Sequence, residues 1–254
     1  MKTYILTPAA GKRLIGRAMA AHPAVRSVLE AGTLVIVAGT TNGYVAEEVL
    51  RTLGDGSGFS RKRFYRGITL PPARSDAPPQ QADTSPFPGD LIVVDGNVQT
   101  GQTIFDVADT LGEGDVILKG ANALDLTNRR AAVLIGDSRT GTAGAAMQAV
   151  VGRRARLIVP VGLEKRVEAD LGGLAACLNA PGSSGPRLYP LIGEVVTELE
   201  AIEMLSGAAA ELVAGGGTGG AEGSVWLGVE GTREQMDAAE ELLSEVCFEP
   251  PFLP

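Results

Sequence analysis

Five clusters of small, polar and charged residues contain most of the side chains in this sequence that could bind or transform a small molecule. Each cluster follows a short apolar run. Amides and hydroxyls in such loops bind anions, while carboxylates and lysines transfer protons or stabilise developing negative charge. In chain order the clusters are 39–43 (GTTNG), 95–97 (DGN), 119–122 (KGAN) with Asp125 just beyond, 136–144 (GDSRTGTAG) and 162–165 (GLEK).

The cluster at 39–43 has the clearest setting. Residues 34–38 (LVIVA) indicate a fully buried strand, because the run is short, rich in Val and Ile, and ends at a glycine. Apolar residues then follow at helical spacing from Tyr44. The loop amides and the first free N–H groups of that helix would point at one spot, which the helix dipole makes favourable for an anion. The alternative is an ordinary strand-to-helix turn in which Thr or Asn caps the helix.

The other clusters follow predicted strands of the same kind. Residues 90–95, 115–118, 131–135 and 157–161 contain continuous apolar runs, and helical patterns separate most of them. Such alternation predicts an α/β fold with an open, mostly parallel sheet that helices cover on both faces. Ligands of such sheets bind beyond the carboxyl ends of the strands. The sequence therefore predicts that all five clusters converge at one edge of the sheet.

Three residues are candidates for catalysis at that edge. Asp95 or Asp125 could act as a proton-transferring base, and Lys119 could stabilise a developing enolate. Each has an ordinary structural alternative: Asp95 as part of an Asp-Gly turn, Asp125 as a helix cap and Lys119 as a surface lysine.

A larger set of residues is expected to bind the substrate. Thr40, Thr41 and Asn42 would anchor a phosphate, and Glu164 with Lys165 would add an acid and a cation at another strand end. For Glu164-Lys165 the alternative is an ordinary helix-start pair. The full set is Gly39, Thr40, Thr41, Asn42, Gly43, Gly96, Gly120, Asn122, Thr140, Gly141, Thr142, Glu164 and Lys165.

A basic run at 61–63 (RKR) precedes a strand-like stretch at 64–70. We favour a solvated edge for this run; the alternative is that Arg63 or Arg66 reaches a bound phosphate. Residues 71–88 are Pro-rich and polar, which predicts a long loop or flap rather than a packed element.

Composition restricts the partners. The net charge of −8 over 254 residues argues against nucleic acid or an anionic membrane as the main partner, but backbone amides could still bind a small anionic metabolite. The single histidine, His22, and two isolated cysteines make no metal-ligand pattern, so we expect neither metal nor cofactor. No apolar run is long enough for a bilayer and no signal segment is evident, which favours a cytoplasmic protein. The sequence leaves open whether the protein forms a homo-oligomer.

The two ends of the chain show different patterns. Residues 1–6 resemble a strand, and 11–30 have helical periodicity with a break at His22-Pro23. Towards the end, strand patterns at 187–192, 209–213 and 224–229 are combined with helical patterns at 198–205 and 234–246. We therefore expect an α/β ligand-binding domain over 1–182 and a small α+β, ferredoxin-like lobe with an antiparallel sheet over 183–254.

The order of these parts resembles ribose-5-phosphate isomerase and, more broadly, the NagB/RpiA/CoA-transferase-like fold family. GTTNGYVAEEVL stands where that family has Gly-Thr-Gly-Ser-Thr and a helix, VVDGN where it has Asp-Gly-Ala-Asp-Glu, and LKGANALD where it has a Lys-Gly-Gly-Gly loop. Two acidic features of the family are missing. No glutamate follows the KGAN loop, and Asn97-Val98 replaces the Asp-Glu pair.

The resemblance and the clusters together predict a protein that binds, and as an enzyme isomerises or otherwise transforms, a small phosphorylated metabolite of the sugar-phosphate type. One alternative is a non-catalytic metabolite sensor or interaction module that keeps the pocket without the base. Another is a CoA-ester transferase, for which Glu164 is the candidate nucleophile.

Overall fold

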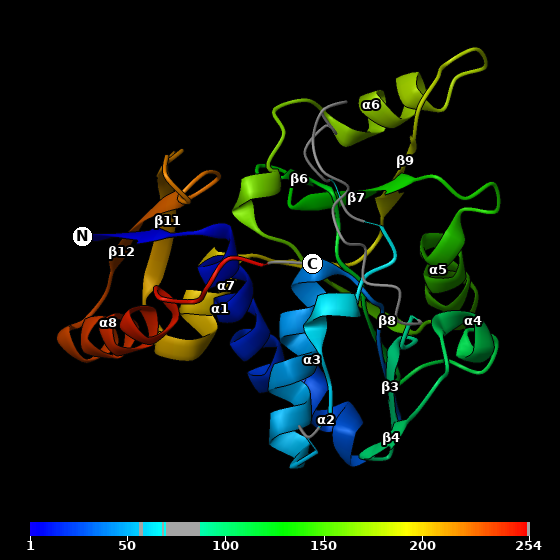
Figure 1. Ribbon diagram of the computed structural model, residues 1–254, viewed down its shortest axis with the longest axis horizontal. Coiled ribbons are helices and arrows are strands. Elements are labelled where there is room, and N and C mark those ends of the chain that lie inside the picture. The colour runs from blue at the N-terminus through cyan, green and yellow to red at the C-terminus, as the bar shows by residue number, and fades with distance from the viewer. Residues whose placement is uncertain (56–57, 68, 70–86, 253–254) are drawn as a thin grey trace, which may run out of the picture.

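The computed structural model describes residues 1–55, 58–67, 69 and 87–252 (Figure 1). It shows a mixed α/β protein with a six-stranded mixed sheet and two three-stranded antiparallel sheets, all of them open. The predicted α/β class is confirmed at this level. The predicted parallel arrangement holds for only part of the largest sheet.

The six-stranded sheet has the order β10-β8-β5-β2-β3-β4. Its strands β10, β8, β5 and β2 run parallel to one another, whereas β3 and β4 are antiparallel to their neighbours. The apolar strands form its centre, and all three of Leu34, Val35 and Ile36 are fully buried. The bounds are β2 Thr33–Ile36, β3 Leu91–Val94, β4 Asn97–Gln99, β5 Val116–Leu118, β8 Arg156–Pro160 and β10 Glu194–Val196.

The reversed direction of β3 follows from the path of the preceding chain. Helix α3 (Thr40–Leu53) carries the chain away from the carboxyl edge of the sheet, and the short helix η1 (Arg61–Arg63) packs against the beginning of α3 again. The chain has therefore returned to the carboxyl edge before β3 begins. Strand β3 must run in the opposite direction to β2, and Thr33 pairs with Val94.

Helices lie on both sides of the sheet in Figure 1, with α2 (Pro23–Glu30) and α3 on one side and α4 (Ile104–Val107) and α5 (Gly141–Arg153) on the other. Helix α1 (Pro8–Ala21) packs against α3. The predicted break at His22-Pro23 is confirmed: His22 ends α1 and its Nδ1 accepts a hydrogen bond from the Ala24 amide at the start of α2.

The predicted strand at 131–135 belongs to a different sheet from the one we expected. It forms β7 (Arg130–Ile135), which pairs antiparallel with β6 (Ala123–Asp125) and β9 (Arg187–Leu191). The short turn between β6 and β7 makes a hairpin, and a hairpin cannot return the chain for a parallel strand. Helix α6 (Leu171–Leu178) packs on this small sheet.

The third sheet joins both ends of the chain, in the order β1-β12-β11. Strand β1 (Lys2–Leu6) pairs with β12 (Val225–Glu230), which pairs with β11 (Ala209–Gly215). Helices α7 (Glu198–Ser206) and α8 (Arg233–Val246) pack with it. An antiparallel sheet was expected from the tail, but its third strand comes from the N-terminus, and β9 and β10 join the other two sheets. Strand pairing therefore crosses the boundary that we placed at residue 182.

Between α3 and β3 the sequence predicts a strand and a Pro-rich loop. The expected strand at 64–70 is wrong for the described residues 64–67 and 69, which are irregular. Of the expected Pro-rich loop, residues 71–86 lie outside the described part of the chain.

Among the helices that the structure describes, none combines the length and apolar character needed to cross a membrane.

Candidate functional site

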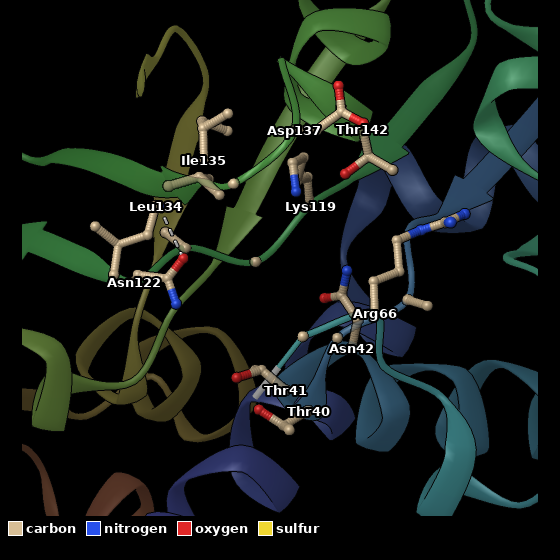
Figure 2. A pocket seen from close by; sticks show the side chains of 18 of the residues that line it. Thr40, Thr41, Asn42, Arg66, Lys119, Asn122, Leu134, Ile135, Asp137 and Thr142 are labelled. Carbon is tan, nitrogen blue, oxygen red and sulfur yellow. Dashed lines mark hydrogen bonds between the residues drawn. The ribbon is translucent and has the colours of Figure 1, made fainter. Parts of the chain in front are cut away.

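A cavity of about 570 Å³ lies beyond the carboxyl ends of β2 and β5, and the loops after β7 and β8 complete its wall (Figure 2). Its described lining includes eleven of the candidate residues named from the sequence: Gly39, Thr40, Thr41, Asn42, Lys119, Gly120, Asn122, Thr140, Gly141, Thr142 and Lys165. Further lining residues are Ala38, Arg66, Gly67, Thr69, Phe105, Ala121, Val133, Leu134, Ile135, Gly136 and Asp137.

The floor of the cavity is the first turn of α3. This helix begins at Thr40, so that GTTNG forms its first turn rather than a loop that precedes it. Gly39 is the N-cap residue, and it has no side chain to bond the free amides. No acidic residue occupies the first turn. The helix therefore presents unoccupied N–H donors and the positive end of its dipole to the cavity.

Two buried side chains of this turn have polar atoms without a partner. Thr41 is 2% exposed, and its Oγ1 makes no hydrogen bond within the described structure. Asn42 is fully buried, and its Oδ1 is likewise unpartnered among the described residues. A buried polar atom left unpaired is costly, and such atoms concentrate where a ligand or water completes the bonding.

The amide nitrogen of Asn42 has a structural task. Its Nδ2 donates hydrogen bonds of 2.7 Å to the Val37 carbonyl and 2.9 Å to the Leu118 carbonyl. These carbonyls lie at the ends of the adjacent strands β2 and β5. Asn42 thus fixes the two strand ends beside the helix start, and Lys119, the residue after Leu118, lines the same cavity.

Lys119 is the principal buried cation of the cavity. It is 7% exposed, and no carboxylate lies within ion-pairing distance of its ammonium in the described part of the chain. Burial lowers the pKa of Lys119 from 10.5 to about 8; nearby Asp90 partly offsets this, and Arg66 lowers the pKa further. A poorly compensated buried ammonium favours an anion beside it. The alternative of a plain surface lysine is wrong.

Arg66 adds a second cation to the wall of the cavity, and the buried Asp90 holds it in place. The Asp90 carboxylate accepts hydrogen bonds of 2.8 Å from the amides of Ala38 and Ile104 and from the Arg66 guanidinium. Asp90 is buried and lies outside the lining, so it anchors Arg66 without facing the cavity itself. Arg66 was an alternative phosphate contact in the sequence, but Asp90 was noted only as the first residue of a strand. A charged residue directly before a buried apolar run was the available signal.

A second helix start lies across the cavity from α3. Helix α5 has no side-chain cap and no acid in its first turn, and Thr140 and Gly141 before and at its start have positive φ angles of 65° and 55°. Asp137 lies close to this turn and is the one carboxylate among the described lining residues. Figure 2 shows Asp137 and Thr142 on the side of Lys119 away from Thr40 and Thr41.

Asn122 and Lys165 line the cavity while holding its wall together. Asn122 Oδ1 accepts a hydrogen bond of 3.0 Å from the Leu134 amide, drawn in Figure 2. Lys165 Nζ donates to the Ala121 carbonyl at 2.9 Å, and burial lowers the pKa of Lys165. Both side chains therefore tie the loop after β5 to neighbouring segments.

Glu164 lies behind the lining in a buried network of acids and lysines. Its Oε1 pairs with Lys12 at 3.0 Å, and Glu164 does not line the cavity. Burial opposes the charge on Glu164, but Lys12 and Lys165 outweigh it and lower its pKa. Neighbouring Glu198 is 1% exposed and accepts from the Leu163 amide at 2.9 Å; burial, and then the charge of Glu164, raise its pKa to about 7.

The structure separates Asp95 and Gly96 from the other candidates. Because β3 runs antiparallel to β2, these residues form the β3–β4 turn at the opposite edge of the sheet. Asp95 Oδ1 accepts a hydrogen bond of 2.8 Å from the amide of Gly32, just before β2 begins. The expectation that Asp95 converges with Lys119 is wrong. Asp95 is instead part of an Asp-Gly turn, the structural alternative given above.

Two further candidates also lie outside the lining. Asp125 ends β6, and hydrogen bonds from the side chain and backbone of Asn128 lower its pKa, so it stabilises the β6–β7 turn. Gly43 lies in the first turn of α3 but packs against Arg61: an added Cβ would lie 2.9 Å from the Arg61 Cβ. Its missing side chain allows η1 to approach the helix.

Comparisons with models of protein families, with curated proteins and with solved structures found no match to this chain.

Proposed function

We propose that this protein binds a small phosphorylated metabolite in the cavity, with the phosphate seated between the first turn of α3 and Lys119. The observation that carries the proposal is the presence of three features in the lining of one cavity. They are free helix amides, an unpartnered buried Thr41 hydroxyl and a buried ammonium without an ion-pair partner in the described structure. Each would be satisfied by phosphate oxygens.

The charge of the lining supports an anionic ligand. The protein as a whole carries a net charge of −8. The described lining, in contrast, has three basic side chains, Arg66, Lys119 and Lys165, and one acid, Asp137. Asp90 pairs with Arg66 from behind the lining, whereas Lys119 has no ion-pair partner among the described residues. A cationic recess in an acidic protein concentrates small anions at the recess and directs them away from the rest of the surface.

The unpartnered Asn42 Oδ1 adds a requirement for a hydrogen-bond donor. A phosphate dianion has none, because its oxygens only accept. A hydroxyl on the same ligand would satisfy this acceptor, which supports a sugar phosphate or another hydroxylated organic phosphate over inorganic phosphate.

Catalysis in this cavity would need a group that moves a proton. Asp95 and Asp125 lie elsewhere, so the amines of Lys119 and Lys165 and the Asp137 carboxylate are the groups available in the described lining. We therefore place binding first, and an isomerase-like proton transfer second. A CoA-ester transferase is the least supported alternative, because Glu164 is paired with Lys12 behind the lining.

The family resemblance remains part of this proposal. The GTTNG and KGAN motifs on which it was based both contribute to the cavity, whereas the DGN motif does not. We propose on this basis that the central α/β sheet is a version of the NagB/RpiA/CoA-transferase-like fold in which the acidic catalytic residues have been lost.

Calorimetric titration with ribose 5-phosphate tests the proposal. We expect the wild type to bind and Lys119→Met to lose affinity by about tenfold or more, because charge-assisted bonds to phosphate are among the stronger polar interactions. The matched control is Lys62→Met, which removes an exposed lysine of η1 outside the cavity and should bind normally. The proposal fails if the wild type binds no phosphorylated sugar, or if both variants behave alike.

A turnover assay separates an enzyme from a sensor. We would follow interconversion of ribose 5-phosphate and its ketose isomer by wild type and by Asp137→Asn. Turnover that disappears in Asp137→Asn while binding persists would identify an isomerase with Asp137 as its base. Binding without turnover in the wild type would support the non-catalytic sensor.

A further inference from the structure

The cavity has exposed apolar side chains that a sugar phosphate would leave uncovered. Phe105 of α4 is 55% exposed and Leu134 of β7 is 43% exposed, although both are large apolar side chains. Val133 and Ile135, the neighbours of Leu134 on the strand, also line the cavity. Exposed apolar side chains gathered around a polar recess are typical of sites in which a ligand covers them.

The Phe105 ring lies close to the Arg66 guanidinium. The Arg66 guanidinium lies 5.6 Å from the Phe105 ring centroid and 4.5 Å from that of Phe87. Asp90 holds the guanidinium in place through a contact of 2.8 Å. Because Arg66 is held by a buried carboxylate, the cavity wall has a fixed guanidinium beside an exposed aromatic ring. Such groups stack on flat ring systems.

The positions of the phosphate seat and of the exposed apolar side chains restrict what the ligand can be. The phosphate seat is at the first turn of α3, and in Figure 2 Leu134 and Arg66 lie on opposite sides of Lys119. The volume of about 570 Å³ falls within the range of roughly 300–1,000 Å³ that is typical of sites for drug-sized ligands. The cavity therefore has room for a second group beside the phosphate and its sugar.

We infer that the ligand is a nucleoside monophosphate, whose base covers Phe105 while its phosphate occupies the seat at α3. This inference rests on the proposed function, because it uses the same phosphate seat. The ribose hydroxyls would serve as donors for Asn42 Oδ1. No base-specific hydrogen bond is needed for such binding, since stacking tolerates any base.

The experiment compares two ligands that differ only in the base. AMP and ribose 5-phosphate are titrated calorimetrically into the wild type, Phe105→Ala, Leu134→Ala and Phe248→Ala. Phe248 is the matched control, an 87% exposed phenylalanine that does not line the cavity. We expect AMP to bind the wild type about tenfold or more tighter than ribose 5-phosphate, the gain that stacking of one base supplies.

The variants then test whether that gain comes from Phe105. Phe105→Ala should lose most of the preference for AMP, with a much smaller change in its affinity for ribose 5-phosphate, and Leu134→Ala should keep the preference, because Leu134 lies on the other side of Lys119 from Arg66. Phe248→Ala should match the wild type. Equal affinity of the wild type for both ligands overturns this inference but leaves the proposed function standing. A preference for AMP that Phe105→Ala retains also overturns it. If the wild type binds neither ligand, both the inference and the proposed function fail.

Discussion

Replacing Lys119 by methionine should make the unliganded protein more stable while weakening its binding of anions. Burial that lowers the pKa of this lysine from 10.5 to about 8 disfavours its charged form by about 3 kcal/mol. With 7% exposure, the group receives little relief from solvent. Methionine has similar length and no charge, so Lys119→Met should raise the free energy of unfolding at pH 7 by up to about 3 kcal/mol.

The pH dependence gives this prediction its signature. Below pH 8 the ammonium is charged in both the folded and the unfolded wild type, and the full cost is present. Between pH 8 and 10.5 the folded protein releases the proton and the unfolded chain keeps it, so the unfolded state binds more protons and wild-type stability rises with pH. The stability gap between Lys119→Met and the wild type should therefore narrow across this window.

Urea denaturation, followed by circular dichroism at pH 7 and at pH 10, measures both effects. Lys62→Met is the control, because Lys62 is exposed on η1 and its replacement should change stability little at either pH. A phosphorylated ligand should stabilise the wild type more than Lys119→Met, since the variant binds it more weakly. The reasoning is refuted if Lys119→Met is no more stable than the wild type at pH 7, or if the gap stays constant with pH.

Three further predictions follow from single contacts. Asn42→Ala should lower the free energy of unfolding by about 2 kcal/mol, measured in urea, because it leaves the Val37 and Leu118 carbonyls without their buried donor. The wild type should lose stability as pH rises from 4.5 to about 7, because Glu198 holds its proton more tightly in the folded protein than in the unfolded chain. Glu198→Gln should remove this loss, which urea unfolding at pH 5 and pH 8 measures. Asp95→Asn should leave binding of ribose 5-phosphate unchanged in calorimetric titration, and a tenfold loss would show that the β3–β4 turn influences the cavity after all.

Local pattern was sufficient for much of the fold and for much of the candidate site. The run at 34–38, the small residues of GTTNG and the helical periodicity after them predicted a helix start behind a buried strand, and α3 begins there. The KGAN and GDSRTGTAG clusters were likewise recognised as ends of strands, and both line the cavity. These features depend on neighbours in the chain, whose periodicity is visible in the sequence.

Strand direction was beyond the reach of the same pattern. Apolar runs in parallel and antiparallel strands of a buried sheet look alike, and only the path of the chain between them sets their direction. The chain returns past η1 before β3, which places Asp95 at the opposite edge from Lys119. Strand β7 was misplaced for a related reason, because its partner β9 lies far along the chain.

The sequence by itself determined most of the longer strands and helices and that small anion-binding residues follow several of them, because those properties depend on periodicity over a few residues. The tertiary structure alone decided which of the clusters meet. It also brought Arg66 and its anchor Asp90 beside Lys119, left Lys119 without an ion-pair partner in the described structure, and exposed Phe105 in the cavity. These outcomes depend on how distant segments pack, and neither burial nor pairing of a charge is written in its immediate neighbours.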